Sequence, residues 1–426
     1  MRRIRTIEDV VQFQLCTGCG ACVFAEPNRY YMENVYDLGL RPFIKADAVQ
    51  ETGEALACCP GIELIHDESS FVNTIEDLQS GWGPVLDVWE GYAENSEIRF
   101  DGSSGGVSSA LALFLMEKKE FGQTLHIKEN PNKPHLNQST VSKSRSDILK
   151  TTGSRYAPAS PCDNLGCVSN CHEKSVFIGK PCDVAAVSKI KQRNREIAEK
   201  LDVSIAFFCA GTPSTEGTLK LLEADGVTNP ENVRSLRYRG KGWPGKWSVT
   251  HSEAFEGSKV VTRTYHNSWS FLQKFRQWRC YICPDHTGEF ADISVGDPWY
   301  REVEPGEHGK SLIVARTEKG KQIILEAAAT GYISLSRNNQ QMLPDSQPNL
   351  LKARGALWGR LIALKVMGAA TPRFVGFDTF AFWVANLSAK EKLQSLFGTV
   401  RRVFIKKLNR RIIVKNKIKS HNEKSS

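Results

Sequence analysis

Short apolar runs alternate with helical patterns through the middle of the chain. The first run, at residues 85–92, predicts a strand, and the apolar positions of residues 105–119 then predict a helix. Further strands are expected where apolar runs end at Gly, Pro or Asp, namely at residues 175–179, 203–209, 291–295 and 311–315. This alternation favours an α/β or α+β fold.

Two other segments have different patterns. Residues 129–146 contain two Pro, three Asn and several Ser, which predicts a loop or weakly structured insertion. Ser388 and Glu391 have the spacing of a capping box, and the helix that they open is apolar on one face and strongly basic on the other. The apolar positions are Leu393, Leu396, Phe397, Val400, Val403, Phe404 and Leu408.

The formal net charge of +9 is confined to the C-terminal end of the chain. Residues 400–426 hold ten Lys and Arg and one acid, whereas the remainder holds 46 basic and 46 acidic residues. A basic groove for nucleic acid is therefore not expected. Polar residues interrupt any secretory apolar run before Cys16, and no apolar stretch approaches the length of a membrane span, so we expect a cytoplasmic protein.

Twelve cysteines in a chain expected in the cytoplasm indicate metal ligation rather than a disulfide framework. Cys16, Cys19 and Cys22 form the pattern C-x2-C-x2-C, in which a tight loop lets three thiolates bind three irons of a 4Fe-4S cubane. The fourth ligand of a bacterial ferredoxin precedes a proline, and Cys59 has that neighbour, so we expect Cys59 to complete the site.

A second cluster is not expected in this N-terminal segment. The position four residues after Cys22 is Glu26, where a two-cluster ferredoxin would have a further cysteine. A structural zinc site and a set of unligated buried cysteines are the competing interpretations. Three further cysteines match no cluster spacing and fit either core packing or an unassigned role: Cys162, Cys167 and Cys171.

A second cysteine set lies further along the chain. Cys280 and Cys283 form a C-x2-C pair, which needs other ligands to close a metal site. Cys182 and Cys209 each lie just after or at the end of a predicted strand, and strand ends are where α/β sites assemble. These four cysteines predict a second 4Fe-4S cluster, with buried packing as the alternative.

Two short motifs are candidates for holding a cofactor. Residues 103–106 form a Gly- and Ser-rich turn before a predicted helix, which offers backbone N–H groups and a positive helix end to a phosphate. Residues 151–156 supply hydroxyls, a cation and an aromatic ring suited to a pyrophosphate or an isoalloxazine. A helix cap and a surface turn explain the two motifs nearly as well. The candidate residues are Ser103, Ser104, Gly105, Gly106, Ser154, Arg155 and Tyr156.

Two charged residues are candidates for both catalysis and cofactor binding. Asp297 follows a predicted strand in a Gly-Asp-Pro turn, where a carboxylate can orient a flavin or shuttle a proton. Lys180 directly follows the predicted strand at residues 175–179 and lies two residues before Cys182. Residues 238–247 combine glycines, cations and indoles, and we expect either a lid over a ligand or an exposed hairpin.

Taken in order, these segments resemble the beta subunits of coenzyme F(420)-reducing hydrogenases and dehydrogenases. The resemblance rests on residues 103–106, 153–156, 178–183, 208–211, 239–245, 280–285 and 291–297. It implies FAD, one or two 4Fe-4S clusters, and hydride or electron transfer at the flavin. The basic C-terminal helix lies beyond the region of resemblance and is similar to that of bacterial members associated with polysaccharide synthesis.

The cysteines and the resemblance together predict an iron-sulfur flavoprotein oxidoreductase. Ferredoxin or another electron-transfer protein would exchange electrons through 4Fe-4S with FAD, which serves a small-molecule hydride acceptor such as coenzyme F(420). One alternative is an electron-relay subunit of a larger complex. Another is an accessory factor of exopolysaccharide synthesis at the inner membrane face, because the basic helix is either a solvated extension or a peripheral membrane contact.

We expect four structural segments. A small ferredoxin-like cluster module occupies residues 1–67, and a mixed α/β flavin-binding domain follows. Residues 83–170 form its N-terminal part, and residues 171–345 form its catalytic part with the second cysteine set. A helical basic tail completes the chain over residues 346–426. The first segment is too small to be stable without a metal or a neighbour.

Overall fold

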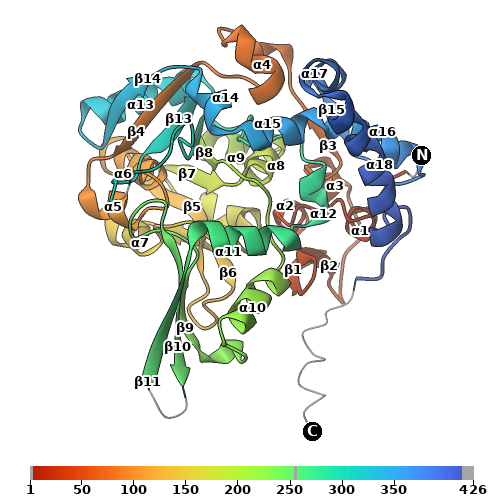
Figure 1. The fold of residues 1–426 in the computed structure, drawn as a ribbon, viewed down its shortest axis with the longest axis horizontal. Helices are drawn as coiled ribbons and strands as arrows, with labels where there is room; N and C mark the ends of the chain where they lie inside the picture. The colour runs from red at the N-terminus through yellow and green to blue at the C-terminus, as the bar shows by residue number, and fades with distance from the viewer. Residues whose placement is uncertain (1–2, 254–256, 305, 415–426) are drawn as a thin grey trace.

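A computed structural model describes residues 3–253, 257–304 and 306–414. At its centre lies an eight-stranded mixed sheet with the strand order β14-β4-β13-β12-β8-β7-β5-β6 (Figure 1). The neighbours from β12 to β5 run parallel, and every other neighbouring pair in this sheet is antiparallel. The strands are β4 (Asp87–Ala93), β5 (Phe121–Glu129), β6 (Asn137–Ser142), β7 (Lys174–Gly179), β8 (Val203–Phe207), β12 (Ile293–Gly296), β13 (Ser311–Ala315) and β14 (Ile333–Asn338).

The mixed α/β class expected from the apolar pattern is confirmed. The five predicted strands correspond to β4, β7, β8, β12 and β13, and the predicted helix at residues 105–119 is α6 (Val107–Lys118). The prediction of a loop over residues 129–146 is wrong in part, because β6 pairs there with β5. Most side chains of β6 are only partly buried, since it is an edge strand, and its polar composition therefore resembles that of a loop.

Alternate side chains of the central strands point into two separate cores. On one face, Val176 packs with α6 and α13 (Glu318–Ala329). On the opposite face, Phe177 packs with α8 (Pro181–Lys191). Cys19 and α2 (Ala21–Ala25), from the first cysteine segment, join this second core. The sheet face that α8 covers is thus also the face that receives the N-terminal cysteines.

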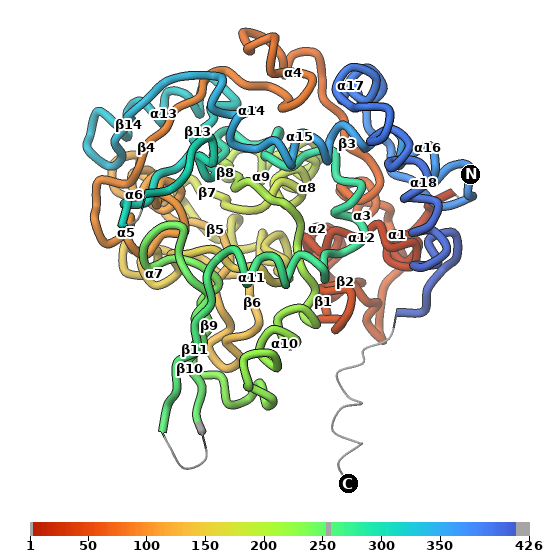
Figure 2. The backbone as a smooth tube through the Cα atoms, in the orientation of Figure 1, coloured from red at the N-terminus to blue at the C-terminus, as the bar shows by residue number. Residues whose placement is uncertain are grey.

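The N-terminal segment has a neighbour from the other end of the chain. Its short strand β3 (Glu63–Ile65) pairs in parallel with β15 (Arg373–Val375). The apolar side chains of α1 (Ile7–Gln12) pack with those of α16 (Leu357–Val366) and α18 (Ala389–Lys406). Figure 2 shows the red N-terminal and blue C-terminal tubes side by side. Residues 346–414 therefore cover the first cysteine segment.

Two smaller sheets and short helices complete the described part of the chain. One hairpin lies in the N-terminal segment, and a three-stranded sheet of β9, β10 and β11 projects from the body of the molecule (Figure 1). The remaining strands are β1 (Tyr30–Val35), β2 (Gly39–Ile44), β9 (Val233–Arg237), β10 (Lys246–Glu253) and β11 (Gly257–Thr264). The remaining helices are α3 (Glu54–Ala57), α4 (Glu76–Trp82), α5 (Ser96–Asp101), α7 (Arg145–Lys150), α9 (Arg195–Lys200), α10 (Thr215–Ala224), α11 (Tyr265–Leu272), α12 (Trp278–Tyr281), α14 (Met342–Ser346), α15 (Pro348–Gly355) and α17 (Thr379–Asn386), with 3-10 turns η1 (Glu68–Phe71), η2 (Pro161–Val168), η3 (Pro230–Asn232) and η4 (Gln273–Phe275).

The capping box that opens the last helix is confirmed, but only part of the predicted apolar face, including Val403 and Leu408, packs against the protein. Ser388 accepts from the Glu391 N–H, and the Glu391 carboxylate accepts from the Ser388 N–H. The buried residues of α18 are Ser395, Thr399 and Val403. Small side chains suit this position because Gly359 of α16 lies directly against Ser395. The other large apolar residues Leu393, Phe397, Phe404 and Ile405 are exposed on a different side of the helix.

Candidate cofactor and metal sites

A cavity of about 280 Å³ opens where three parallel strands of the large sheet end. The segments after β7, β8 and β12 line it together with the start of α6, and strand ends are where α/β folds place ligands. The structure brings four separate sequence motifs together in this wall. Eight of the nine residues predicted to hold the cofactor line it: Ser103, Ser104, Gly106, Ser154, Arg155, Tyr156, Lys180 and Asp297.

The N-terminus of α6 is the part of the wall best suited to a phosphate. Gly106 occupies the N-cap position with a φ of 74°, a left-handed conformation that favours glycine. Among the described residues no side chain caps this helix, and Val107, Ser108 and Ser109 of its first turn line the cavity. Uncapped N–H groups at the positive end of a helix fit an anionic group.

Other residues of this turn hold the scaffold together. Ser104 Oγ donates to a backbone carbonyl beside β13 at 2.5 Å. Gly105 lies outside the cavity wall; its N–H donates to Ser311 Oγ at 2.9 Å, and a Cβ at this position would meet backbone atoms. Ser103 Oγ accepts from the N–H of Ser154 at 2.5 Å. That bond joins the two motifs predicted to bind the cofactor.

Arg155 also lines the cavity, but its guanidinium is occupied by the protein. All three nitrogens donate to protein acceptors, and the side chain is 10% exposed. These bonds tie the segment before β6 to β9, so the group positions loops and has little donor capacity left for a pyrophosphate. The acceptors are Glu129, Pro134, Leu136, Asn137 and Leu236.

Asp297 follows β12 and forms a bidentate ion pair with Arg239. The two oxygen–nitrogen distances are 2.6 and 2.7 Å. Burial acts to lower the pKa of Arg239, but Asp297 raises it above its ordinary value. The Arg239 guanidinium also lies 4.5 Å from the ring centre of Tyr265 and 5.4 Å from that of Trp299. All three nitrogens of Arg239 donate to the protein, two to Asp297 and one to the Pro244 carbonyl. The ion pair is therefore neutral overall, and it fixes a planar guanidinium among aromatic rings in a wall suited to a planar ligand. It also engages the carboxylate that was predicted as a proton shuttle.

Lys180 lies at the start of α8, between the cavity and the cysteines. Its Nζ donates to Asp183 Oδ1 at 2.5 Å and to the Ala159 carbonyl at 3.4 Å. Burial acts to lower the pKa of Lys180, but Asp183 and then Cys182 raise it above its ordinary value. An ammonium that stays charged in the interior can stabilise negative charge developing in the cavity, whereas it releases a proton reluctantly.

The four cysteines of the first set lie together. Cys16, Cys19 and Cys22 come from the segment between α1 and the first turns of α2, and Cys59 follows α3. Burial raises the pKa of Cys22, and the other three thiols of the set raise it further. Burial likewise raises the pKa of Cys59 to about 12. Gly18 adopts a φ of 75°, which allows the tight loop between the first two ligands.

Cys162 lies against the first set, which the sequence did not indicate. It is fully buried, and a hydrogen bond between Cys162 and Cys19 lowers the pKa of the Cys19 thiol. The backbone N–H of Cys162 also donates to the Cys19 carbonyl at 3.0 Å. No local spacing could have revealed a contact across so many residues. Cys167 and Cys171 are partly exposed. Cys167 packs against the core that contains Cys19 and Cys162, and Cys171 Sγ donates to Glu173 at 3.4 Å.

The four cysteines of the second set line one small pocket of about 40 Å³. Cys182 belongs to the first turn of α8, Cys209 follows β8, and Cys280 and Cys283 lie in and after α12. Burial raises the pKa of Cys209 to about 12, and Cys280 contributes to this rise. The Thr212 N–H donates to Cys280 Sγ at 3.4 Å. The structure therefore brings together the second predicted ligand set.

Two buried arginines stand between the cysteine sets. Arg41 is 3% exposed and Arg279 is 4% exposed, and neither forms an ion pair within the described residues. The Nε of each is buried with no hydrogen-bond partner in the described chain. Arg41 donates to Gln277 at 2.8 Å, and Arg279 donates to the Pro60 carbonyl at 3.3 Å. Each guanidinium thus bridges the first cysteine segment to the second.

These unpaired cations fit an anionic group held by the cysteines. Buried charges ordinarily have a counter-charge, and Arg41 counteracts the rise that burial causes in the pKa of Cys16. Arg279 acts in the same way on the pKa of Cys283. Iron-sulfur clusters bring negative charge and accept hydrogen bonds at their sulfurs. The thiols and arginines therefore form a donor set that such a cluster would satisfy.

Among the described residues, no three His, Cys, Asp or Glu side chains are grouped so as to hold a single metal ion. A 4Fe-4S cubane places each thiolate on a different iron, so its ligands surround a volume. The pocket between the four thiols of the second set is an arrangement of that kind. Four thiolates are also the ligands that iron-sulfur clusters prefer.

Aromatic residues of the cavity wall were missed in part. Tyr265 and Trp269 come from α11 and line the cavity, and their spacing of four residues in a helix was available as a signal for one shared face. Of residues 238–247, residues 238–245 connect β9 to β10, and the last two begin β10. In that segment Trp243 Nε1 donates to Asp297 at 3.1 Å, which places part of the expected lid or hairpin against the cavity wall.

Two family models match the chain over more than half of its length. The model described as coenzyme F(420) hydrogenase/dehydrogenase, beta subunit N-terminus, matches residues 88–165, and the corresponding C-terminal model matches residues 172–341. One of the subunits of the F(420)H(2) dehydrogenase of Methanosarcina mazei is 23% identical over 85% of this chain and 93% of its own length. The beta subunit of the coenzyme F(420) hydrogenase of Methanosarcina barkeri is 24% identical over 56% of this chain and 77% of its own length.

A solved structure has the same fold. One chain of the F(420)-reducing nickel-iron hydrogenase complex from Methanosarcina barkeri matches with a TM-score of 0.53 and 22% identity, covering 67% of this chain and 94% of that chain. The two matching family models follow one another in the order of the sequence motifs. The chain belongs to the family of coenzyme F(420) hydrogenase and dehydrogenase beta subunits, whose members are oxidoreductases.

Proposed function

We propose that this chain is an iron-sulfur flavoprotein that transfers electrons between a protein partner such as ferredoxin and a small-molecule hydride acceptor. In this proposal residues 1–67 act as a ferredoxin-type module, and the α/β body binds FAD. Curated relatives are named as F(420)-dependent dehydrogenases and a sulfite reductase, which supports a hydride acceptor of the coenzyme F(420) type.

The continuity of the three candidate sites carries this proposal. The small pocket of the second cysteine set shares Cys209, Gly211 and Thr212 with the large cavity. The same small pocket is also lined by Thr17 and Pro60, which are direct sequence neighbours of first-set cysteines. Each site therefore touches the next, as an electron path from the first cysteines to the cavity requires.

The protein's own residues would bind, orient and shield the cofactors. The start of α6 would hold a phosphate, and the wall of Arg239, Tyr265 and Trp299 would face a planar ring. Lys180 would keep a positive charge near that ring. Bound FAD would supply hydride and single-electron exchange, and 4Fe-4S clusters would supply single-electron storage.

Anaerobic reconstitution tests the proposal. We expect iron, acid-labile sulfide and flavin to remain bound to the full chain after desalting, with iron for two clusters and about one flavin per chain. The variants Cys16→Ser and Cys182→Ser should each lose the iron of one cluster, whereas Cys171→Ser, whose thiol is partly exposed, should lose none. Retention of zinc without iron or flavin would refute the assignment.

A second candidate is an electron-relay subunit without a substrate of its own. The similar solved chain comes from a multi-subunit hydrogenase complex, which favours this possibility. The two candidates differ in what reoxidises the reduced flavin of the isolated chain. Reoxidation by a small acceptor such as coenzyme F(420) supports an independent enzyme, and reoxidation only after a partner subunit is added supports a relay.

A further inference from the structure

Large apolar side chains are unusually exposed at the C-terminal end of the described chain. The described residues include 17 exposed large apolar side chains, of which eight lie between positions 366 and 413. These residues are Val366, Phe380, Val384, Leu393, Phe397, Phe404, Ile405 and Ile413. Monomeric soluble proteins seldom gather such residues without a binding role.

Four of them form an outward face on α18. This face consists of Leu393, Phe397, Phe404 and Ile405, which are between 54% and 68% exposed. A helix turns by about 100° per residue, so these positions lie on the side opposite Ser395 and Thr399, the residues that pack against the protein. The outward face therefore has no covering element in the described chain.

The charge around this face is strongly positive. Residues 346–414 contain 13 Lys and Arg but only two acidic residues, Asp378 and Glu391. Lys390 and Arg401 lie on the same side of α18 as the exposed apolar residues. Viewed down the helix axis, with about 100° per residue, both fall at angles between those of Leu393 and Ile405. An apolar strip with cations on the same side of a helix matches the boundary of an anionic lipid bilayer.

We propose that the outward face of α18 docks this protein onto an anionic membrane surface. Among the described helices, none has the length and apolar character needed to cross a bilayer, so the contact is peripheral, with α18 lying along the surface. The opposite face of α18 packs in the core that contains Cys16. Docking would therefore hold the first cysteine site on the membrane side of the molecule, independently of whether the proposed cofactors are bound.

Vesicle sedimentation with the full-length protein tests this proposal. We expect the protein to sediment with phosphatidylcholine vesicles that contain about a third phosphatidylserine, to remain soluble with pure phosphatidylcholine, and to be released by high salt. The triple variant Leu393→Ser, Phe397→Ser, Phe404→Ser should bind at least about tenfold more weakly, since each replaced side chain removes apolar area from the contact.

Two further variants separate charge from apolar contact. The double variant Lys390→Gln, Arg401→Gln should weaken binding to anionic vesicles by roughly fivefold per charge. Val260→Ser is the matched control, because Val260 is 60% exposed on β11 and far along the chain from this face. Thermal unfolding should show that all of these surface variants are folded.

The proposal is overturned if the unaltered protein does not bind anionic vesicles, or if the triple variant binds them as well as the unaltered protein does. A dimer that the triple variant converts to a monomer, with no vesicle binding, would assign the face to a second copy of the chain instead. Cofactor content is measured on the same samples, so failure of membrane binding and failure of the proposed redox function are distinguishable.

Discussion

At the scale of single residues, two buried guanidiniums distinguish the cysteine sites from ordinary core packing. Arg41 and Arg279 each reach from one cysteine segment to the other, and the Nε of each has no acceptor among the described residues. Burial lowers the pKa of Arg41, and Cys16 and Cys280 oppose that change more than Asp37 does. A cation in this position should favour any state that adds an electron nearby.

If the cysteines hold the proposed clusters, replacement of Arg41 should alter their reduction potential. In Arg41→Met we expect a midpoint potential lower by an amount on the order of tens of millivolts, because the reduced cluster loses a nearby positive charge. Redox titration followed by electron paramagnetic resonance measures this shift. Arg41→Lys keeps the charge and should retain most of the potential. Equal potentials in the Met variant and the unaltered protein would contradict the electrostatic role.

The Arg239–Asp297 pair should determine how tightly the proposed flavin is held. In Asp297→Asn the guanidinium loses its bidentate partner, so the wall formed with Tyr265 and Trp299 loses its fixed position. We expect flavin affinity to fall by at least about tenfold, since hydrogen bonds to charged groups contribute roughly 1.5–3 kcal/mol. Fluorescence titration of flavin into the apoprotein measures this loss. Glu231→Gln, which breaks only the exposed ion pair with Lys133, should leave the affinity unchanged.

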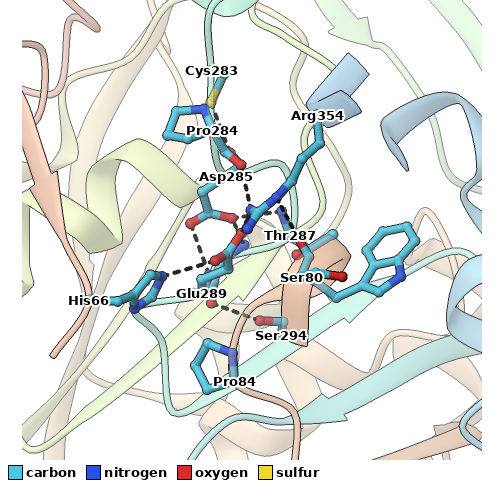
Figure 3. Close-up of polar contacts among 12 residues, drawn as sticks. His66, Ser80, Pro84, Cys283, Pro284, Asp285, Thr287, Glu289, Ser294 and Arg354 are labelled. Atoms are coloured by element: carbon cyan, nitrogen blue, oxygen red, sulfur yellow. Dashed lines mark hydrogen bonds and ion pairs between the residues drawn. The ribbon is translucent and has the colours of Figure 1, made fainter. Parts of the chain in front are cut away.

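At the scale of elements, a buried polar network joins α15 to the segment of the second cysteine set (Figure 3). Arg354 of α15 pairs with Glu289 and donates to the Pro284 carbonyl at 2.8 Å. Glu289 also contacts His66 Nε2 at 2.9 Å, so three distant segments meet at one carboxylate. The Asp285 carboxylate accepts three backbone N–H groups and shapes the turn after Cys283.

Loss of the Arg354 guanidinium should destabilise the whole chain. Arg354→Met leaves Glu289 buried with its main counter-charge removed, and breaking such a pair lowers the free energy of unfolding by about 3–5 kcal/mol. Chemical denaturation of the apoprotein measures the change. Arg373→Met, which removes an ion pair whose arginine side chain is 68% exposed, should change stability by about 1 kcal/mol or less. Similar losses in the two variants would contradict this view of the network.

The strand pair β5–β6 should make the protein sensitive to acid. Burial lowers the pKa of His126 from 6.5 to about 4, and its Nε2 lies 2.7 Å from Ser142 Oγ on β6. Below pH 6.5 the unfolded chain therefore binds a proton at His126, whereas the folded chain binds it only below about pH 4. The free energy of unfolding thus decreases as the pH is lowered from 6.5 to about 4. We expect His126 to contribute about 2 kcal/mol of this loss at pH 5.

Urea unfolding at neutral pH and at pH 5 measures that contribution. His126→Gln should show a smaller loss of stability on acidification than the unaltered protein, because glutamine does not titrate in this range. His172→Gln is the control, since His172 is exposed. An identical pH dependence in His126→Gln and the unaltered protein would contradict the assignment.

At the scale of the whole molecule, the two ends of the chain form one unit around the first cysteine site. Leu15 and Cys16 share a core with Leu357, Val403 and Leu408, and β3 pairs with β15. The C-terminal residues beyond the family match thus supply the neighbour that the N-terminal segment needs for stability.

Removal of the C-terminal region should expose the proposed first cluster. For a chain ending at residue 345 we expect a lower melting temperature and faster bleaching of cluster absorbance in air, because the core around Cys16 opens to solvent and oxygen. A chain ending at residue 414 retains every described element and should behave like the full-length protein. Unchanged cluster lifetime in the shorter chain would show that residues 346–414 do not protect the site.

The sequence by itself determined features that depend on local order. Cysteine spacing indicated the first three cysteines of the predicted ligand set, charge counts located the basic end, and short apolar runs identified five strands of the central sheet, because each of these properties is written in neighbouring residues. The edge strand β6 escaped this treatment, since an exposed edge has a polar composition.

Only the tertiary structure decided which distant residues meet. It brought Cys182, Cys209, Cys280 and Cys283 to one pocket, engaged the predicted cofactor ligand Arg155 in structural bonds, and placed Cys162 beside Cys19. It also turned the predicted apolar face of α18 partly outward, because the small residues Gly359 and Ser395 gave the closer helix contact. Such outcomes depend on packing between elements, and no local pattern contains that information.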